Sequence, residues 1–436
     1  MEIDFEKYHR AVEKAELVRV IGKVVQVVGL IIEAQVGGVS VGDICSIRID
    51  KDNREASAEV VGFRENRVLL MPLGSTAGIS PGAQVLAAGR PLLVRVGNDL
   101  LGRVLNGLGE PVDGKGPIEG EADYPLDADP PDPVKRPRIT EIMRVGIRAI
   151  DGLLTIGKGQ RIGIFAGSGV GKSTVMGMIA RNAEADINVI SLVGERGREV
   201  RDFIEESLGE EGLKKSVVIV ATSDQPPLIR LKAAFVATAI AEYFRNNGKK
   251  VILMMDSVTR FAMAQREIGL AAGEPPTTKG YTPSVFALLP RLMERSGTAV
   301  VGTITAFYTI LVEGDDMNEP IADHSRSILD GHIVLSRDLA ARNHYPAIDI
   351  PHSVSRLMTN LTAEDHKQAA GKLREVLARY SEAEDLINIG AYVKGSNPKI
   401  DYALSKIEQV NGFLKQGTFE KVQFEDTVNK LITIFR

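Results

Sequence analysis

Ala166-Gly-Ser-Gly-Val-Gly-Lys-Ser-Thr174 is the stretch that decides the fold of this chain. It follows an apolar run, Arg161 to Ala166, and precedes the helix-forming run VMGMIARNA. Glycines let a backbone curl so that its N–H groups converge on phosphate oxygens, and the start of a helix adds a favourable dipole. The sequence therefore predicts a P-loop between a strand and a helix. The strict motif begins with glycine, so Ala166 is a mild departure from it.

This loop carries most of the groups that a nucleotide needs. Lys172 places a point charge against the β- and γ-phosphates, and the Ser173 hydroxyl is suited to bind Mg²⁺, with Thr174 facing other contacts. We expect MgATP to be the ligand. The predicted ATP-binding residues of the loop are Gly167, Ser168, Gly169, Val170, Gly171, Lys172, Ser173 and Thr174.

Two later apolar runs end in carboxylates. Val251 to Asp256 is apolar until its last residue, so Asp256 is expected at the carboxyl edge of a strand, where it can hold Mg²⁺ directly or through water. The run that ends at Val193 is followed by Glu195, to which we assign the polarisation of the attacking water. For Arg196 the residues alone leave three roles open. It contacts the γ-phosphate, it holds Glu195 in place, or the two side chains form a solvated salt bridge.

Periodicity divides the chain into three kinds of structure. Short β-rich runs from Leu17 to about Gly89 predict a small β-barrel, and eight of the 20 prolines lie in 91–138, which favours an extended connector. After about Met358 amphipathic helices are expected near 364–380 and 399–414. Between them, apolar runs alternate with helical stretches, which predicts a parallel sheet with strands at 161–166, 188–193, 217–221, 251–256, 299–305 and 332–335.

The predicted fold class is α/β: a RecA-like P-loop core with a parallel sheet, an N-terminal β-barrel and a C-terminal helical domain. The expected domains are the barrel at 19–90, the nucleotide-binding domain at 91–356, which includes the connector 91–138, and the helical domain at 357–436. Residues 1–18 form a separate charged segment.

Composition disfavours several classes of protein. The net charge is −4, without the basic excess that nucleic-acid binding requires, so we expect no nucleic-acid partner. The single cysteine, Cys45, cannot form an internal disulfide and is interpreted as a buried thiol. The N-terminus has no apolar signal-peptide region, and Pro72 and Pro81 interrupt the longest uncharged stretch. A cytoplasmic location with at most peripheral membrane contact follows as an expectation.

Several motifs together resemble those of type III export ATPases, which are relatives of the catalytic subunit of rotary ATP synthases. The resemblance runs from about residue 18 to the C-terminus. Asn318–Asp323, Ile328–His332 and Asp385–Tyr392 look more like the flagellar export ATPase than the injectisome one, which is the alternative. The motifs that carry the wider resemblance are Phe165–Ser173, GERGREV at 194–200, DSVTRF at 256–261, GEPPTTKGYTP at 273–283 and YPAID at 345–349.

This resemblance implies roles for individual residues. Tyr345 matches an aromatic residue that packs against adenine. Arg356 matches an arginine finger that is presented in trans to the neighbouring subunit's γ-phosphate, so the resemblance implies a homohexamer. The catalytic residues that we carry over or retain are Lys172, Glu195, Arg196 and Arg356, and the magnesium residues are Ser173 and Asp256.

The same resemblance implies the biological role. It is that of a MgATP-hydrolysing motor of flagellar protein export, placed at the inner face of the cytoplasmic membrane, that promotes chaperone release and the delivery of substrates. The partners implied are a stator-like regulator at residues 1–18, a coiled-coil stalk protein in a pore lined by 274–283, the export gate, and export chaperones with their substrates. For residues 1–18 a frayed, disordered terminus is the alternative.

Three other functions remain as alternatives. A hexameric nucleic-acid translocase shares the RecA-like core, but the acidic net charge and the absence of a basic, aromatic-rich barrel disfavour it. A noncatalytic regulatory subunit is expected to lack a carboxylate at 195. A catalytic subunit of a proton-driven ATP synthase needs a different companion subunit to supply the arginine finger.

Overall fold

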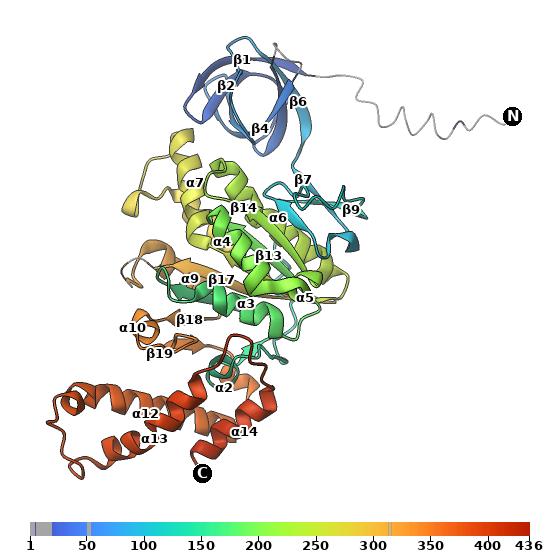
Figure 1. Cartoon of the computed structure of the whole chain (residues 1–436). Coiled ribbons are helices and arrows are strands. Elements are labelled where there is room, and N and C mark those ends of the chain that lie inside the picture. The colour runs from blue at the N-terminus through green and yellow to red at the C-terminus, as the bar shows by residue number, and fades with distance from the viewer. Residues whose placement is uncertain (1–4, 6–19, 50–53, 313, 315) are drawn as a thin grey trace. The chain divides into compact units, whose positions relative to one another are not determined.

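The computed structural model describes residues 5, 20–49, 54–312, 314 and 316–436, and the chain divides into two compact units (Figure 1). One unit comprises the chain up to Leu92 together with Ile268–Glu274, and the other comprises Leu93–Glu267 and Pro275–Arg436. Apart from Phe5, the segment 1–18, expected to bind a regulator, lies outside the described residues.

The first unit contains a closed six-stranded barrel, which confirms the predicted β-barrel. Inward-facing residues such as Ile47 and Val85 are fully buried and alternate with more exposed neighbours, and Ile32 is fully buried in a strand without such alternation. Cys45 is also buried there, and burial raises the pKa of its thiol to about 11. In barrel order the strands are β1 (Ile21–Val28), β2 (Ile31–Gln35), β5 (Arg67–Pro72), β4 (Arg54–Arg64), β3 (Asp43–Ile49) and β6 (Gln84–Pro91).

The second unit is built on a sheet whose neighbouring strands are parallel except where β18 meets β19 and where β16 (Gly297–Thr298) meets β17. Its strands at 161–166, 187–193 and 250–256 are buried along almost their whole length, which explains why their sequences lack polar alternation. The predicted parallel-sheet core is confirmed. In sheet order the strands are β19 (Ile348–Ser355), β18 (Gly331–Leu335), β12 (Arg161–Ala166), β17 (Thr303–Leu311), β15 (Lys250–Asp256), β13 (Ile187–Val193), β14 (Ser216–Ala221) and β8 (Val104–Asn106).

Helices connect these strands. The long helix α6 (Pro227–Asn246) packs on β13, β14 and β15, and α3 (Lys172–Asn182) follows the P-loop. The other helices around the sheet are α4 (Gly197–Asp202), α5 (Gly209–Lys214), α7 (Val258–Ala272), α8 (Pro283–Met293), α9 (Pro320–Ile328) and α10 (Arg337–Ala341), with short turns of helix at Asn98–Leu100, Phe203–Leu208 and Thr278–Gly280.

One predicted strand is wrong in its position. The expected strand at 299–305 is in fact a turn followed by β17, which runs on to Leu311. Val300 and Val301 are 79% and 69% exposed in that turn, because β16 pairs antiparallel with the start of β17 and the two valines lie between them. The strand predicted from hydrophobicity alone therefore begins four residues before β17 does. The polar residues Thr305 and Thr309 interrupt the apolar character of the true strand.

The proline-rich stretch 91–138 differs from a plain connector. It contains β7 (Leu93–Val96) and β9 (Ala122–Pro125), which pair with each other, and β8, which forms the edge of the main sheet. Prolines stand at strand ends here, as Pro91 ends β6 and Pro125 ends β9, so they remove no ladder hydrogen bond from a central strand.

The C-terminal part is helical, as predicted. Leu373, Phe413 and Leu431 are fully buried and belong to the same hydrophobic core as sheet residues such as Ile162 and Ile333. In the described part of the chain no helix is long and apolar enough to cross a membrane. The elements are α11 (Met358–Leu361), α12 (Glu364–Asn388), α13 (Pro398–Leu414) and α14 (Phe424–Ile434), with α2 (Arg148–Leu153), β10 (Ile142–Met143) and β11 (Ile156–Gly157) beside them.

Candidate active site

The P-loop lies at the carboxyl edge of the sheet, between β12 and α3. Gly169 and Gly171 have φ angles of 79° and 90°, which other residues rarely adopt, so glycine is required at both positions. The loop borders a cleft of about 870 Å³. All the predicted loop residues line this cleft except Val170, whose side chain is buried in the core.

Three charged side chains meet beside the P-loop: Lys172 and Glu195 line the cleft, and the buried Asp256 lies against Lys172 without lining it. Lys172 Nζ lies 2.5 Å from Asp256 Oδ1 and 3.2 Å from Glu195 Oε1. Asp256 ends β15, Glu195 closely follows β13, and Lys172 begins α3 after the loop that follows β12. The parallel topology brings the ends of these three strands to one edge. Burial by itself lowers the pKa of Lys172, but attraction to Asp256 and Glu195 outweighs it, and the pKa is raised. The lysine is therefore held in its charged form where phosphates are expected.

Glu195 has the environment of a proton acceptor. Burial raises the pKa of its carboxyl group, and the nearby Lys172 lowers it only in part. A hydrogen bond shared with Glu199 raises the pKa further. A carboxylate with a raised pKa takes a proton from water more readily than an ordinary one. Glu199, which was not among the predicted site residues, also lines the cleft.

Arg196 pairs with Glu199 and not with Glu195. Its side chain is 81% exposed and pairs with Glu199, with 3.6 Å between Nη1 and Oε1. It still lines the cleft, together with Arg260 and Arg337, which were not predicted. Arg260 follows Asp256 by one helical turn, a spacing that the sequence displays in the DSVTR motif.

Tyr345 lies beside the P-loop. A methyl group at Gly171 would be 3.7 Å from the Tyr345 ring, which is 42% exposed. Tyr345 lines a separate cavity of about 340 Å³ with Thr174, Pro346 and Gln416. Gln416 comes from the loop after α13, and its backbone N–H donates to the Tyr345 carbonyl at 3.0 Å. A flat nucleotide base fits such an aromatic, partly apolar cavity.

Arg356 is not in the cleft of its own chain. It follows β19, is exposed, and its Nη2 donates to the carbonyl of Arg326 at 3.3 Å. It does not line the cavity that contains Lys172 and Glu195. The structure therefore places Arg356 apart from the P-loop cleft of its own chain.

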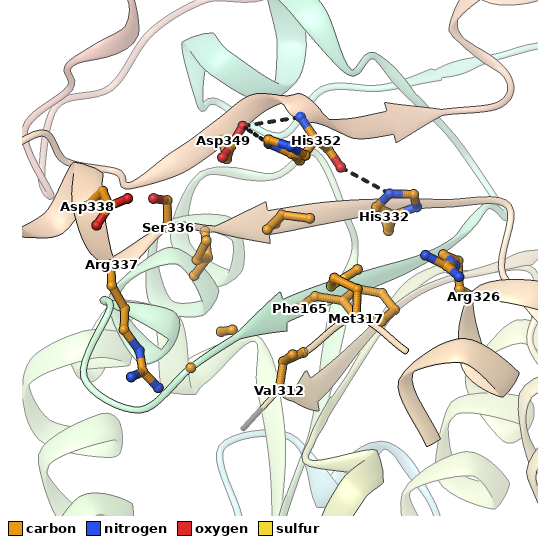
Figure 2. A pocket seen from close by; sticks show the side chains of 14 residues that line it. Phe165, Val312, Met317, Arg326, His332, Ser336, Arg337, Asp338, Asp349 and His352 are labelled. Atoms are coloured by element: carbon orange, nitrogen blue, oxygen red, sulfur yellow. Dashed lines mark hydrogen bonds and ion pairs between the residues drawn. The ribbon is translucent and has the colours of Figure 1, made fainter. Parts of the chain in front are cut away.

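A second pocket, of about 410 Å³, lies behind the P-loop (Figure 2). Arg337 extends from the start of α10 to the P-loop, and a Cβ atom added at Gly167 would be 2.6 Å from its guanidinium group. Gly167 therefore has to remain without a side chain if Arg337 is to keep this position. On the other side of the pocket, His332 Nε2 lies 3.1 Å from the His352 carbonyl oxygen, and burial lowers the pKa of His332.

The residues at the cleft fit a magnesium ion that arrives with a nucleotide. In the described ranges no three His, Cys, Asp or Glu residues gather into a metal cage. Mg²⁺ typically uses one or two protein oxygens together with phosphates and water. The Ser173 hydroxyl and the Asp256 carboxylate are oxygen donors of the kind that this ion prefers.

Three family models match the chain. The ATP synthase alpha/beta family, beta-barrel domain, matches residues 24–89, and the nucleotide-binding domain of the same family matches residues 146–355. The T3SS EscN ATPase C-terminal domain matches residues 362–433.

Whole relatives and solved structures agree with these models. The flagellum-specific ATP synthase of Bacillus subtilis is 60% identical over 95% of this chain and 94% of that protein. The type 3 secretion system ATPase of Xanthomonas euvesicatoria is 53% identical over 95% of this chain and 93% of that protein. The structure of the assembled ATPase EscN from the enteropathogenic E. coli type III secretion system superposes with a TM-score of 0.91 at 46% identity, covering 95% of this chain and all of that one.

Proposed function

The chain is an ATPase that belongs to the ATP synthase alpha/beta family, within the group of flagellum-specific and type III secretion ATPases, and on this premise we propose that it drives flagellar protein export. In this proposal it hydrolyses MgATP to promote chaperone release and substrate delivery. The greater identity to a flagellum-specific relative, 60% against 53%, supports the flagellar branch. The injectisome ATPase is the second candidate, because the superposed structure comes from that system.

The observation that carries the hydrolytic function is the meeting of Lys172, Asp256 and Glu195 at the end of the P-loop. We assign Lys172 to the β- and γ-phosphates and Ser173 with Asp256 to magnesium, which neutralises charge that develops on the phosphates. Glu195 orients the attacking water and accepts its proton, which is consistent with its raised pKa. Tyr345 packs on the base. Arg196 is retained in the catalytic set as a contact to the γ-phosphate.

A ring of identical subunits is part of the proposal. Arg356 lies outside the cleft of its own chain, and an arginine finger that acts in trans explains why a catalytic arginine would stand there. Identical copies that pair P-loop with finger close into a ring, for which we propose a homohexamer. The solved complex of EscN with its central stalk EscO supports a stalk protein as a partner. The regulator, export gate and chaperones remain proposals from the family.

The first experiment measures MgATP hydrolysis against protein concentration for wild type, Glu195→Gln, Arg356→Ala and an equal mixture of the two variants. Each variant alone should be nearly inactive, with losses of about 10²- to 10⁴-fold. In a random mixture roughly a quarter of the interfaces combine an intact Glu195 with an intact Arg356, so activity should partly return. Arg379→Ala removes another arginine, from α12, and should have no effect.

Two results would contradict the shared site. Full activity of Arg356→Ala, or specific activity that does not depend on concentration, would place the whole site in one subunit. The biological branch has its own test. Expression of the chain in a strain that lacks its flagellar export ATPase should restore motility, whereas rescue of injectisome secretion alone would favour the second candidate.

A further inference from the structure

Thr309 is a buried polar residue beside the catalytic cluster, and none of the roles above uses it. It lies in β17, with no exposed surface, between β12, which leads into the P-loop, and β15, which ends at Asp256. Its Oγ1 donates a hydrogen bond of 2.6 Å to Asp256 Oδ1. A hydroxyl in the centre of an apolar sheet is costly unless it is bonded, and here its partner is an active-site carboxylate.

Asp256 Oδ1 accepts hydrogen bonds from two donors that differ in mobility. One is Lys172 Nζ, at the end of a long flexible chain and 2.5 Å away. The other, Thr309, has a stiff β-branched side chain on a strand that is paired on both sides. Of the residues that the structure describes, none donates a hydrogen bond to Oδ2. When Lys172 turns to a nucleotide phosphate, Thr309 is the donor that stays.

The frame around this hydrogen bond is fixed as well. The backbone N–H of Leu311, at the end of β17, donates to Thr259 Oγ1 at 2.9 Å. Thr259 lies in the first turn of α7, directly after the segment that contains Asp256. The end of β17 and the chain that follows β15 are therefore held together independently of Lys172.

We propose that Thr309 is a positioning residue that keeps the Asp256 carboxylate in one orientation, with Oδ1 engaged and Oδ2 available to magnesium or its water. The inference rests on the magnesium role proposed for Asp256. Outer-shell partners of metal ligands act in this way, by fixing the ligand before the ion arrives. Thr309 therefore affects how tightly magnesium is held with the nucleotide, and not how tightly the nucleotide binds alone.

The test is binding of a fluorescent ADP analogue to the full chain, first without metal and then during titration with Mg²⁺. Thr309→Val, of nearly the same shape, should raise the half-saturating Mg²⁺ concentration by about 10- to 100-fold and leave metal-free binding unchanged. Thr309→Ser keeps the hydroxyl and should restore the wild-type midpoint. If the valine variant does not fold, Thr309→Cys, a weaker donor, should give an intermediate shift.

Thr305→Val is the matched control. Thr305 is equally buried on the same strand, and its hydroxyl accepts a hydrogen bond of 2.8 Å from the Gly159 N–H, so its loss should lower the melting temperature without moving the Mg²⁺ midpoint. Equal midpoints for the two valine variants, or a serine variant as impaired as the valine one, would overturn the inference. Asp256→Asn separates the positioning role of Thr309 from the magnesium role of Asp256. If this variant has the wild-type Mg²⁺ midpoint, the magnesium role of Asp256 itself is wrong.

Discussion

Arg148→Met should loosen the loop that closes the base cavity. Arg148 begins α2, and its side chain is only 8% exposed. Its Nε donates to the Phe413 carbonyl at 2.8 Å, and its two terminal nitrogens contact the Lys415 carbonyl and the Glu420 carboxylate. Its backbone N–H donates to Gln416 Oε1 at 2.8 Å. One side chain thus fixes the whole turn after α13.

The size of the stability loss follows from the hydrogen bonds that methionine cannot make. It retains the apolar stem but removes a charged donor from two carbonyl groups, each bond being worth about 1.5–3 kcal/mol. The Glu420 contact adds little, because that carboxylate is 42% exposed. We expect the free energy of unfolding to fall by about 3–6 kcal/mol, the sum of the two bonds. Since the same loop positions Gln416 beside Tyr345, the KM for ATP should rise severalfold while kcat stays near that of wild type.

The assay is urea unfolding followed by far-ultraviolet circular dichroism, since the chain has no tryptophan. Glu420→Gln is the matched control, because it leaves both carbonyl bonds intact and should cost less than about 1 kcal/mol. If Arg148→Met unfolds with the wild-type midpoint, or if the two variants cost the same, the stabilisation does not come from the carbonyl bonds and the reasoning fails.

Two further predictions concern stability. Burial raises the pKa of Asp151 from 3.8 to about 7, so the folded state binds the proton more tightly than the unfolded state. The stability that the protonated Asp151 contributes is complete below the unfolded pKa and is lost as the pH rises through about 7. In urea unfolding between about pH 5 and 8, the free energy of unfolding of wild type should therefore fall by about 2–3 kcal/mol relative to that of Asp151→Asn. Gly302→Ala should destabilise the protein by more than about 2 kcal/mol, because its Cβ would lie 2.3 Å from the Arg245 carbonyl oxygen. Gly371→Ala should stabilise it by about 0.5–1 kcal/mol in the same assay, because no atom of the described residues lies near this position on α12. If Gly302→Ala is the more stable of the two variants, both predictions are wrong.

The sequence alone could predict the parts of the site that are local in the chain. The P-loop can be predicted because its glycines, Lys172 and Ser173 lie within a few residues of one another, and the required backbone shape depends only on these residue types. Asp256 and Glu195 were found because the first ends and the second closely follows a buried apolar strand, and parallel strands bring such ends to one edge. The barrel and the terminal helices were predicted from periodicity, which is also a local property.

Other features depend on contacts between residues far apart in the chain, and only the tertiary structure decided them. The hydrogen bond of Thr309 to Asp256 requires the register of β17 against β15, which no pattern near either residue specifies. The exposed turn at Val300 depends on pairing with β16, which overrides the preference of valine for a strand interior. The clamp of Arg148 on the loop after α13 joins residues that only the packed core brings together. Local chemistry thus specified the nucleotide loop, and long-range packing specified what holds its partners in place.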